Sequence, residues 1–143
     1  PHDDRANPPV ISVDSSIVVA GFASWHEAHV PARAALARQP RLPAHVALEV
    51  YSVLTRLPPP HRFAPRLVAE LLTAHFPEAP LTLPGRQQTA LIEIALEAEV
   101  TGGAIYDALV AATAKHAGAT LLTRDKRART IYEAVGVDFD FVT

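Results

Sequence analysis

The chain has 143 residues, of which 49% are apolar and 20% charged, and its formal net charge is −2. These values are typical of one folded domain and exclude both a disordered chain and a polycation that binds nucleic acid through its overall charge. The absence of cysteine excludes a disulfide framework and a thiolate metal site, and it suits a cytoplasmic location. No apolar run reaches the ~20 residues of a membrane span, so no membrane contact is predicted.

The first half of the chain predicts strands that alternate with helices. Residues 1–9 are polar and rich in proline, which predicts a flexible tail followed by a single domain over 10–143. The β-branched run at 10–13 predicts a buried strand, and the Asp14-Ser15-Ser16 segment after it is able to begin a helix. Further along we predict a helix over 25–38, a short strand over 41–44, a helix over 46–57 ended by three prolines, and a helix over 65–76.

The second half continues this alternation. We predict a strand over 81–83, a helix over 87–100, an apolar helix from 104 that ends at Gly118, a strand over 119–123, a helix over 124–135 and a strand over 137–142. Strands and helices in this order predict an α/β domain with a mostly parallel sheet. The sequence shows no internal repeat and no second domain.

Four of the 15 acidic residues lie in apolar surroundings, namely Asp14, Glu49, Asp107 and Asp125. An ionised carboxylate there is unfavourable unless a cation or hydrogen bonds compensate it. Asp14 and Asp125 follow predicted strands, whereas Glu49 and Asp107 lie near the start of predicted helices. In a parallel α/β sheet these positions share one edge, where such folds bind ligands. We therefore expect the four carboxylates to converge on one site.

Converging carboxylates repel one another and retain protons unless a cation screens them. Their hard oxygen atoms suit Mg²⁺ or Mn²⁺, which lower the pKa of bound water and stabilise negative charge during phosphodiester cleavage. The alternative is that each acid separately caps a helix or pairs with an arginine, and Asp14 and Asp125 are credible caps. Capping does not explain Glu49 or Asp107, which have no lysine or arginine one helical turn away. We favour a shared metal site.

A basic segment adjoins the fourth acid and consists of Arg124, Lys126, Arg127 and Arg129. Positive charge is unfavourable at the N-terminus of a helix, so a negative group is expected to compensate it. An RNA phosphate backbone is one candidate and Asp125 is another. We treat the four basic residues as candidate RNA contacts, with a solvated start of a helix as the alternative.

Two aromatic residues lie close to the acids in the sequence. His45 precedes Glu49 by one helical turn, a spacing that a metal can use. Because carboxylates already suffice as ligands, we prefer a capping or solvent-facing role for His45. Tyr106 directly precedes Asp107, and we predict that it belongs to the core rather than to a base-stacking surface.

The chain resembles the PIN domain, and within it the VapC toxins of type II toxin–antitoxin pairs. The resemblance covers residues 10–142 and is carried by ISVDSSIVVA, by an isolated glutamate in an apolar helix, and by IYDALVAATAKHAGATLLTRDKRA. It implies an α/β/α sandwich with a mostly parallel sheet of about five strands. It also places the acidic metal-site positions at Asp14, Glu49, Asp107 and Asp125, with Ser16 and Thr123 orienting a carboxylate, a water or a phosphate.

The resemblance also implies a function. It implies an endoribonuclease that uses Mg²⁺ or Mn²⁺, inhibits translation and growth, forms a homodimer and is neutralised by a cognate VapB-type antitoxin. Some relatives carry another acid shortly after the fourth, where this chain has Lys126, Arg127 and Arg129. The class of RNA remains open between transfer, ribosomal and messenger RNA.

Two other functions are alternatives for this sequence. One is a non-catalytic PIN-like binding module, which would be expected to lack one or more of the acids. The other is a phosphotransfer domain that forms an aspartyl phosphate, but the adjacent acidic pair and the late lysine of such domains are missing from the sequence. A metal-dependent ribonuclease is the preferred interpretation.

Overall fold

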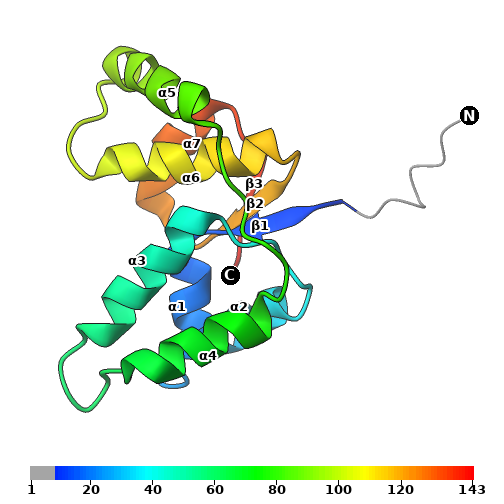
Figure 1. The fold of residues 1–143 in the computed structure, drawn as a ribbon, viewed down its shortest axis with the longest axis vertical. Helices are drawn as coiled ribbons and strands as arrows, with labels where there is room; N and C mark the ends of the chain where they lie inside the picture. Colours follow the sequence, from blue (N-terminus) through cyan, green and yellow to red (C-terminus); the bar gives the residue numbers. More distant parts are fainter. Residues whose placement is uncertain (1–8) are drawn as a thin grey trace, which may run out of the picture.

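The computed structural model describes residues 9–143, and its parallel sheet lies between two groups of helices (Figure 1). The sheet has the order β1-β2-β3, with β1 at Ile11–Val13, β2 at Thr120–Thr123 and β3 at Phe139–Phe141. Apart from Pro9, the predicted N-terminal tail lies outside the described residues. The α/β class and the parallel sheet are confirmed.

The sheet is narrower than the predicted five strands. Within residues 9–143 it has three, and the segments predicted as strands over 41–44 and 81–83 form only isolated parallel bridges, Ser12 with Arg41 and Pro43 with Leu81. The Arg41 N–H donates to the Ile11 carbonyl at 2.8 Å, which continues the sheet beyond β1. Pro43 has no N–H to donate, so a regular ladder cannot extend through it.

Seven α-helices and one 3₁₀ helix are described. In chain order they are α1 (Ser15–Phe22), α2 (His29–Leu36), α3 (Ala44–Thr55), α4 (Pro65–His75), α5 (Gly85–Ala98), α6 (Ala104–His116), the 3₁₀ helix η2 (Lys126–Ala128) and α7 (Arg129–Val135). Figure 1 shows α5, α6 and α7 on one side of the sheet and α1 to α4 on the other. The predicted sandwich of helices and sheet is confirmed. No helix in residues 9–143 is both long and apolar enough to span a membrane.

Two helices differ from the prediction for local reasons. The helix predicted to begin at residue 25 begins at His29, which places Pro31 in the first turn, where its missing N–H needs no partner. Before it, the Ala28 N–H donates to His26 Nδ1 at 3.0 Å and forms a turn. The helix predicted over 124–135 is divided into η2 and α7.

The core fixes the edge of the sheet at which β1 and β2 end. Val13, Leu121 and Leu122 from these strands are buried. Small side chains line the buried face of α6, namely Ala108, Ala111 and Ala114, and they allow this apolar helix to pack closely. The strand ends and the start of α6 are therefore held by dense packing.

Candidate active site

The four predicted acids lie where two strands end and two helices begin. Asp14 follows β1 and is the N-cap of α1, while Asp125 follows β2 and is the N-cap of η2. Asp107 lies in the first turn of α6, and Glu49 lies in the N-terminal half of α3. Segments from both halves of the chain therefore supply carboxylates at one edge of the sheet.

The negative charges of these residues act on one another. The pKa of Glu49 is raised to about 7, first by burial and then by the charges of Asp107 and Asp14. Burial, followed by the charges of Asp125 and Asp14, raises the pKa of Asp107 to about 6. Like charges raise a carboxyl pKa in this way when they are close together. The fold thus brings all four acids into one electrostatic cluster, which we call the carboxylate cluster.

The carboxylate cluster is partly engaged in helix capping. Asp14 Oδ1 accepts a hydrogen bond from the Ser16 N–H at 3.1 Å, and Asp125 Oδ1 accepts one from the Arg127 N–H at 3.0 Å. The capping roles weighed above are therefore present in these two residues. A carboxylate has about four lone-pair sites, so capping leaves acceptor capacity on both.

The side chains of the carboxylate cluster have the chemistry of metal ligands but are spread apart. As the side chains lie, no three histidine or acidic groups within residues 9–143 are close enough to hold one ion. Glu49 and Asp107 are only half-buried, however, and can rotate toward a shared cation. Hard carboxylate oxygens are the ligands that Mg²⁺ and Mn²⁺ prefer, and a cation would offset both the burial and the mutual repulsion that raise the two pKa values. The donor set therefore fits a divalent cation.

Asp14 is the most enclosed acid of the cluster, with 5% of its surface exposed. Burial raises its pKa, and hydrogen bonds from Ser16, Thr123 and Tyr132 oppose this effect. The Ser16 hydroxyl donates a short hydrogen bond to Asp14 Oδ1 and accepts one from the Arg124 N–H at 2.9 Å. Ser16 thereby links the ends of β1 and β2.

Thr123 has a comparable position at the end of β2. It is fully buried, and its Oγ1 accepts a hydrogen bond from the Asp125 N–H at 3.0 Å. This contact fixes the backbone that carries Asp125. Ser16 and Thr123 thus orient two acids of the carboxylate cluster.

Tyr132 is part of the site, although the sequence analysis did not identify it. Its hydroxyl donates to Asp14 Oδ2 at 2.7 Å across 118 positions of the chain, and the residue is 1% exposed. The ring packs edge-to-face against Phe139 with 5.6 Å between the centroids. The available signal was weak: a tyrosine on a short helix, whose hydroxyl needs a partner once it is buried.

Replacing Tyr132 by phenylalanine is expected to lower the free energy of unfolding by about 1–2 kcal/mol, because a buried carboxylate oxygen loses its donor while the ring still packs. Urea denaturation at neutral pH measures this change. Tyr51→Phe is the matched control, since Tyr51 is exposed, and should change stability by less than about 0.5 kcal/mol. Equal stability of Tyr132→Phe and the unmodified protein would show that the hydroxyl does not stabilise Asp14.

The four basic residues after β2 differ in how freely they can bind a ligand. The Arg124 side chain donates to a backbone carbonyl of the C-terminal segment at 2.9 Å. Arg129 pairs with Glu133 at 3.1 Å. Lys126 is exposed, and the Arg127 side chain is 98% exposed, although its Nε lies 4.0 Å from Asp125 Oδ1. Lys126 and Arg127 are therefore the best placed of the four to contact a phosphate.

Two aromatic residues beside the cluster differ from their predicted roles. Tyr106 is 51% exposed rather than part of the core. The N-cap of α3 is Pro43, so His45 does not cap this helix, and its ring instead stacks on Tyr106 with 5.0 Å between centroids and 12° between planes. His45 Nε2 also lies 3.8 Å from Glu49 Oε1. The stack connects α3 to α6 beside Glu49 and Asp107, a contact between helices that local sequence does not reveal.

Comparison with known proteins gives the same classification. The chain matches the PIN domain family over residues 11–134. It is 52% identical over 134 residues to ribonuclease VapC40 of Mycobacterium tuberculosis, a match that covers 94% of this chain and 100% of that protein. It is 45% identical over 130 residues to ribonuclease VapC27 of the same organism, covering 90% of this chain and 94% of that protein. The chain belongs to the PIN domain family and is of the VapC type.

Proposed function

We propose that this protein is an endoribonuclease that hydrolyses RNA phosphodiester bonds with Mg²⁺ or Mn²⁺. The observation that carries the proposal is the convergence of four carboxylates where β1 and β2 end and α6 begins, a place where burial and then the neighbouring negative charges raise the pKa values of Glu49 and Asp107 to about 7 and about 6. A divalent cation bound by the cluster would neutralise these charges and remove the repulsion between them. The ribonuclease names of VapC40 and VapC27 support RNA as the substrate.

Each group of residues has a defined part in this proposal. The residues that would hold the metal are Asp14, Glu49, Asp107 and Asp125. When bound, the metal lowers the pKa of water and offsets negative charge at the phosphate. Ser16 and Tyr132 orient Asp14 through hydrogen bonds to its two oxygens, and Thr123 fixes the Asp125 backbone. Lys126 and Arg127 attract the RNA backbone.

We further propose that the protein acts in the cytoplasm as a growth-inhibiting toxin that blocks translation. In this proposal it forms a homodimer and is neutralised by a cognate VapB-type antitoxin. The similarity to two proteins named VapC supports this assignment. Co-purification of the protein with the product of an adjacent antitoxin gene, followed by loss of its nuclease activity, tests the partner.

Metal removal tests the enzymatic proposal. Protein treated with EDTA is expected to leave total RNA intact, and addition of Mg²⁺ or Mn²⁺ should restore cleavage, because the bound cation would activate the attacking water. Mapping of the new RNA ends then identifies the substrate. Undiminished cleavage in EDTA would contradict metal dependence. Absence of cleavage with either ion, for protein shown to be folded by circular dichroism, would favour the non-catalytic binding module.

A further inference from the structure

We propose that a groove beside the carboxylate cluster binds one unpaired base of the RNA substrate, next to the phosphate that is cleaved. The inference rests on the proposed ribonuclease function. The groove lies between α3 and the start of α6 and has a volume of about 580 Å³. The residues that carry the inference are Glu49, which belongs to the cluster, together with His45, Leu48, Arg56 and Tyr106.

The aromatic stack forms one side of this groove. His45 stacks on Tyr106 with nearly parallel rings, which fixes the orientation of the tyrosine between two helices. Tyr106 nevertheless remains 51% exposed. An aromatic ring that is held in place and half exposed offers a surface on which an unpaired base can stack with little loss of conformational entropy. Leu48, which is 70% exposed, adds apolar surface to the same groove.

The charges along the groove suit a nucleotide. Glu49 lies between His45 and Arg56 on α3, and Arg56 is seven positions beyond Glu49, about 10 Å away along the helix axis. The Arg56 Nη1 group donates to Ser52 Oγ at 3.0 Å, which holds the guanidinium at the groove. Its remaining N–H groups can donate to a phosphate, since a guanidinium has five. A base on Tyr106 would thus share one groove with an acid of the carboxylate cluster and with a cation.

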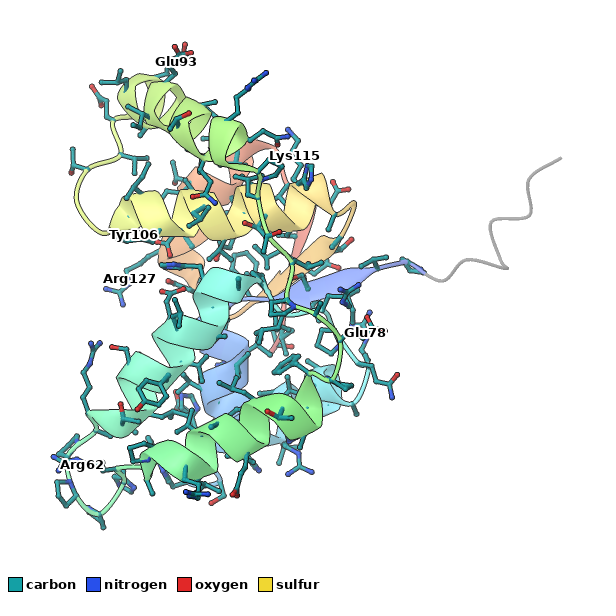
Figure 2. All side chains as sticks on the ribbon, viewed as in Figure 1. Arg62, Glu78, Glu93, Tyr106, Lys115 and Arg127 are labelled. Atoms are coloured by element: carbon teal, nitrogen blue, oxygen red, sulfur yellow. The ribbon has the colours of Figure 1, made fainter. Side chains whose placement is uncertain are left out.

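The position of the groove favours RNA over a protein partner. Glu49 lines the groove and also belongs to the carboxylate cluster, so an occupant of the groove is continuous with the substrate at the cluster. Figure 2 shows Tyr106 and Arg127 on the same side of the molecule, where α6 begins. An RNA strand that reaches the cluster from this side would therefore meet both Arg127 and the groove.

The test measures RNA binding without cleavage. Short fluorescent single-stranded oligonucleotides of A, U, C or G are titrated with the 143-residue protein in EDTA, and anisotropy gives Kd. Tyr106→Ala is expected to weaken binding about tenfold for the preferred oligonucleotide, and Tyr106→Phe to retain it, because base stacking needs only the ring. With 2-aminopurine in the oligonucleotide, fluorescence quenching on binding should persist in Tyr106→Phe and disappear in Tyr106→Ala.

Tyr51→Ala is the matched control. Tyr51 is also an exposed tyrosine of this protein and lies on α3, but it lines a different groove, so its loss should not change Kd. Equal Kd and equal quenching for Tyr106→Ala and the unmodified protein would overturn the base site. Weaker antitoxin binding by Tyr106→Ala with unchanged RNA affinity would assign the groove to protein and would also overturn it. Neither result bears on the proposed function, which the metal-dependent cleavage assay tests separately.

Discussion

Replacing Asp107 by asparagine is expected to slow RNA cleavage by at least about a hundredfold, a loss typical of removing one preorganised charge-stabilising group. The same substitution should leave the metal-free protein as stable as the unmodified protein or slightly more stable. Burial, followed by the charges of Asp125 and Asp14, raises the pKa of Asp107, so this carboxylate opposes folding when it is ionised. Asparagine keeps the shape and removes the charge. Cleavage under single-turnover conditions with Mn²⁺, and urea denaturation in EDTA, measure the two effects.

Glu93→Gln provides the matched control for charge removal. Glu93 is an exposed acid on α5, away from the start of α6 where Tyr106 lies (Figure 2). Its replacement should change neither cleavage nor stability. If Asp107→Asn cleaves RNA as fast as the unmodified protein, Asp107 is not part of the active site. If it unfolds much more readily in EDTA, Asp107 is a structural hydrogen-bonding group instead.

The metal-free protein is expected to lose stability as the pH rises from about 4 to about 7. The pKa values of Glu49 and Asp107 in the folded protein, about 7 and about 6, exceed their ordinary values of 4.5 and 3.8. Between these values the folded state holds protons that the unfolded state has released, so protonation favours folding and this contribution disappears as the pH rises through the folded pKa. Allowing for the partial exposure of both groups, the expected loss is about 1–3 kcal/mol.

Glu49→Gln isolates the contribution of one carboxyl. Urea denaturation in EDTA at about pH 5 and about pH 8 should show a smaller loss of stability for the variant than for the unmodified protein. Burial lowers the pKa values of His45 and His75, so these two histidines make the stability rise with pH. Both histidines are present in the variant and in the unmodified protein, so the comparison between the two proteins isolates Glu49. At the higher pH, Mg²⁺ at one hundred times its Kd should raise the free energy of unfolding by about 2.7 kcal/mol. An identical pH dependence in the two proteins would mean that the pKa of Glu49 is not raised in the folded protein.

The sequence was sufficient to predict β1 and β2, because each is a short apolar run that ends just before a helix-capping segment. It was misleading at 41–44 and 81–83, where apolar alternation is present but Pro43 prevents a ladder. These segments show that apolar pattern alone does not determine hydrogen-bonding capacity. The number of strands in the sheet therefore depends on single residues such as Pro43, which an apolar pattern does not distinguish.

The carboxylate cluster could be predicted because each acid is unusual in its own local surroundings. Tyr132 could not be identified in this way, since the reason for its burial is an aspartate 118 positions away. The stack of Tyr106 on His45 likewise joins two helices that are far apart in the sequence. Contacts between distant segments are fixed by tertiary packing, so they leave no local signal in the sequence.

The pairing of β1 with β2 has a consequence for the order in which the protein becomes active. Ile11 pairs with Thr120, and Asp14 depends on Tyr132 for a hydrogen bond, so the first strand is synthesised long before its partners. A chain still being translated has Asp14 but neither the neighbouring strand nor Asp125. The carboxylate cluster therefore assembles only after the segment that reaches Tyr132 has been synthesised, so a nascent chain that ends before this segment has no complete site.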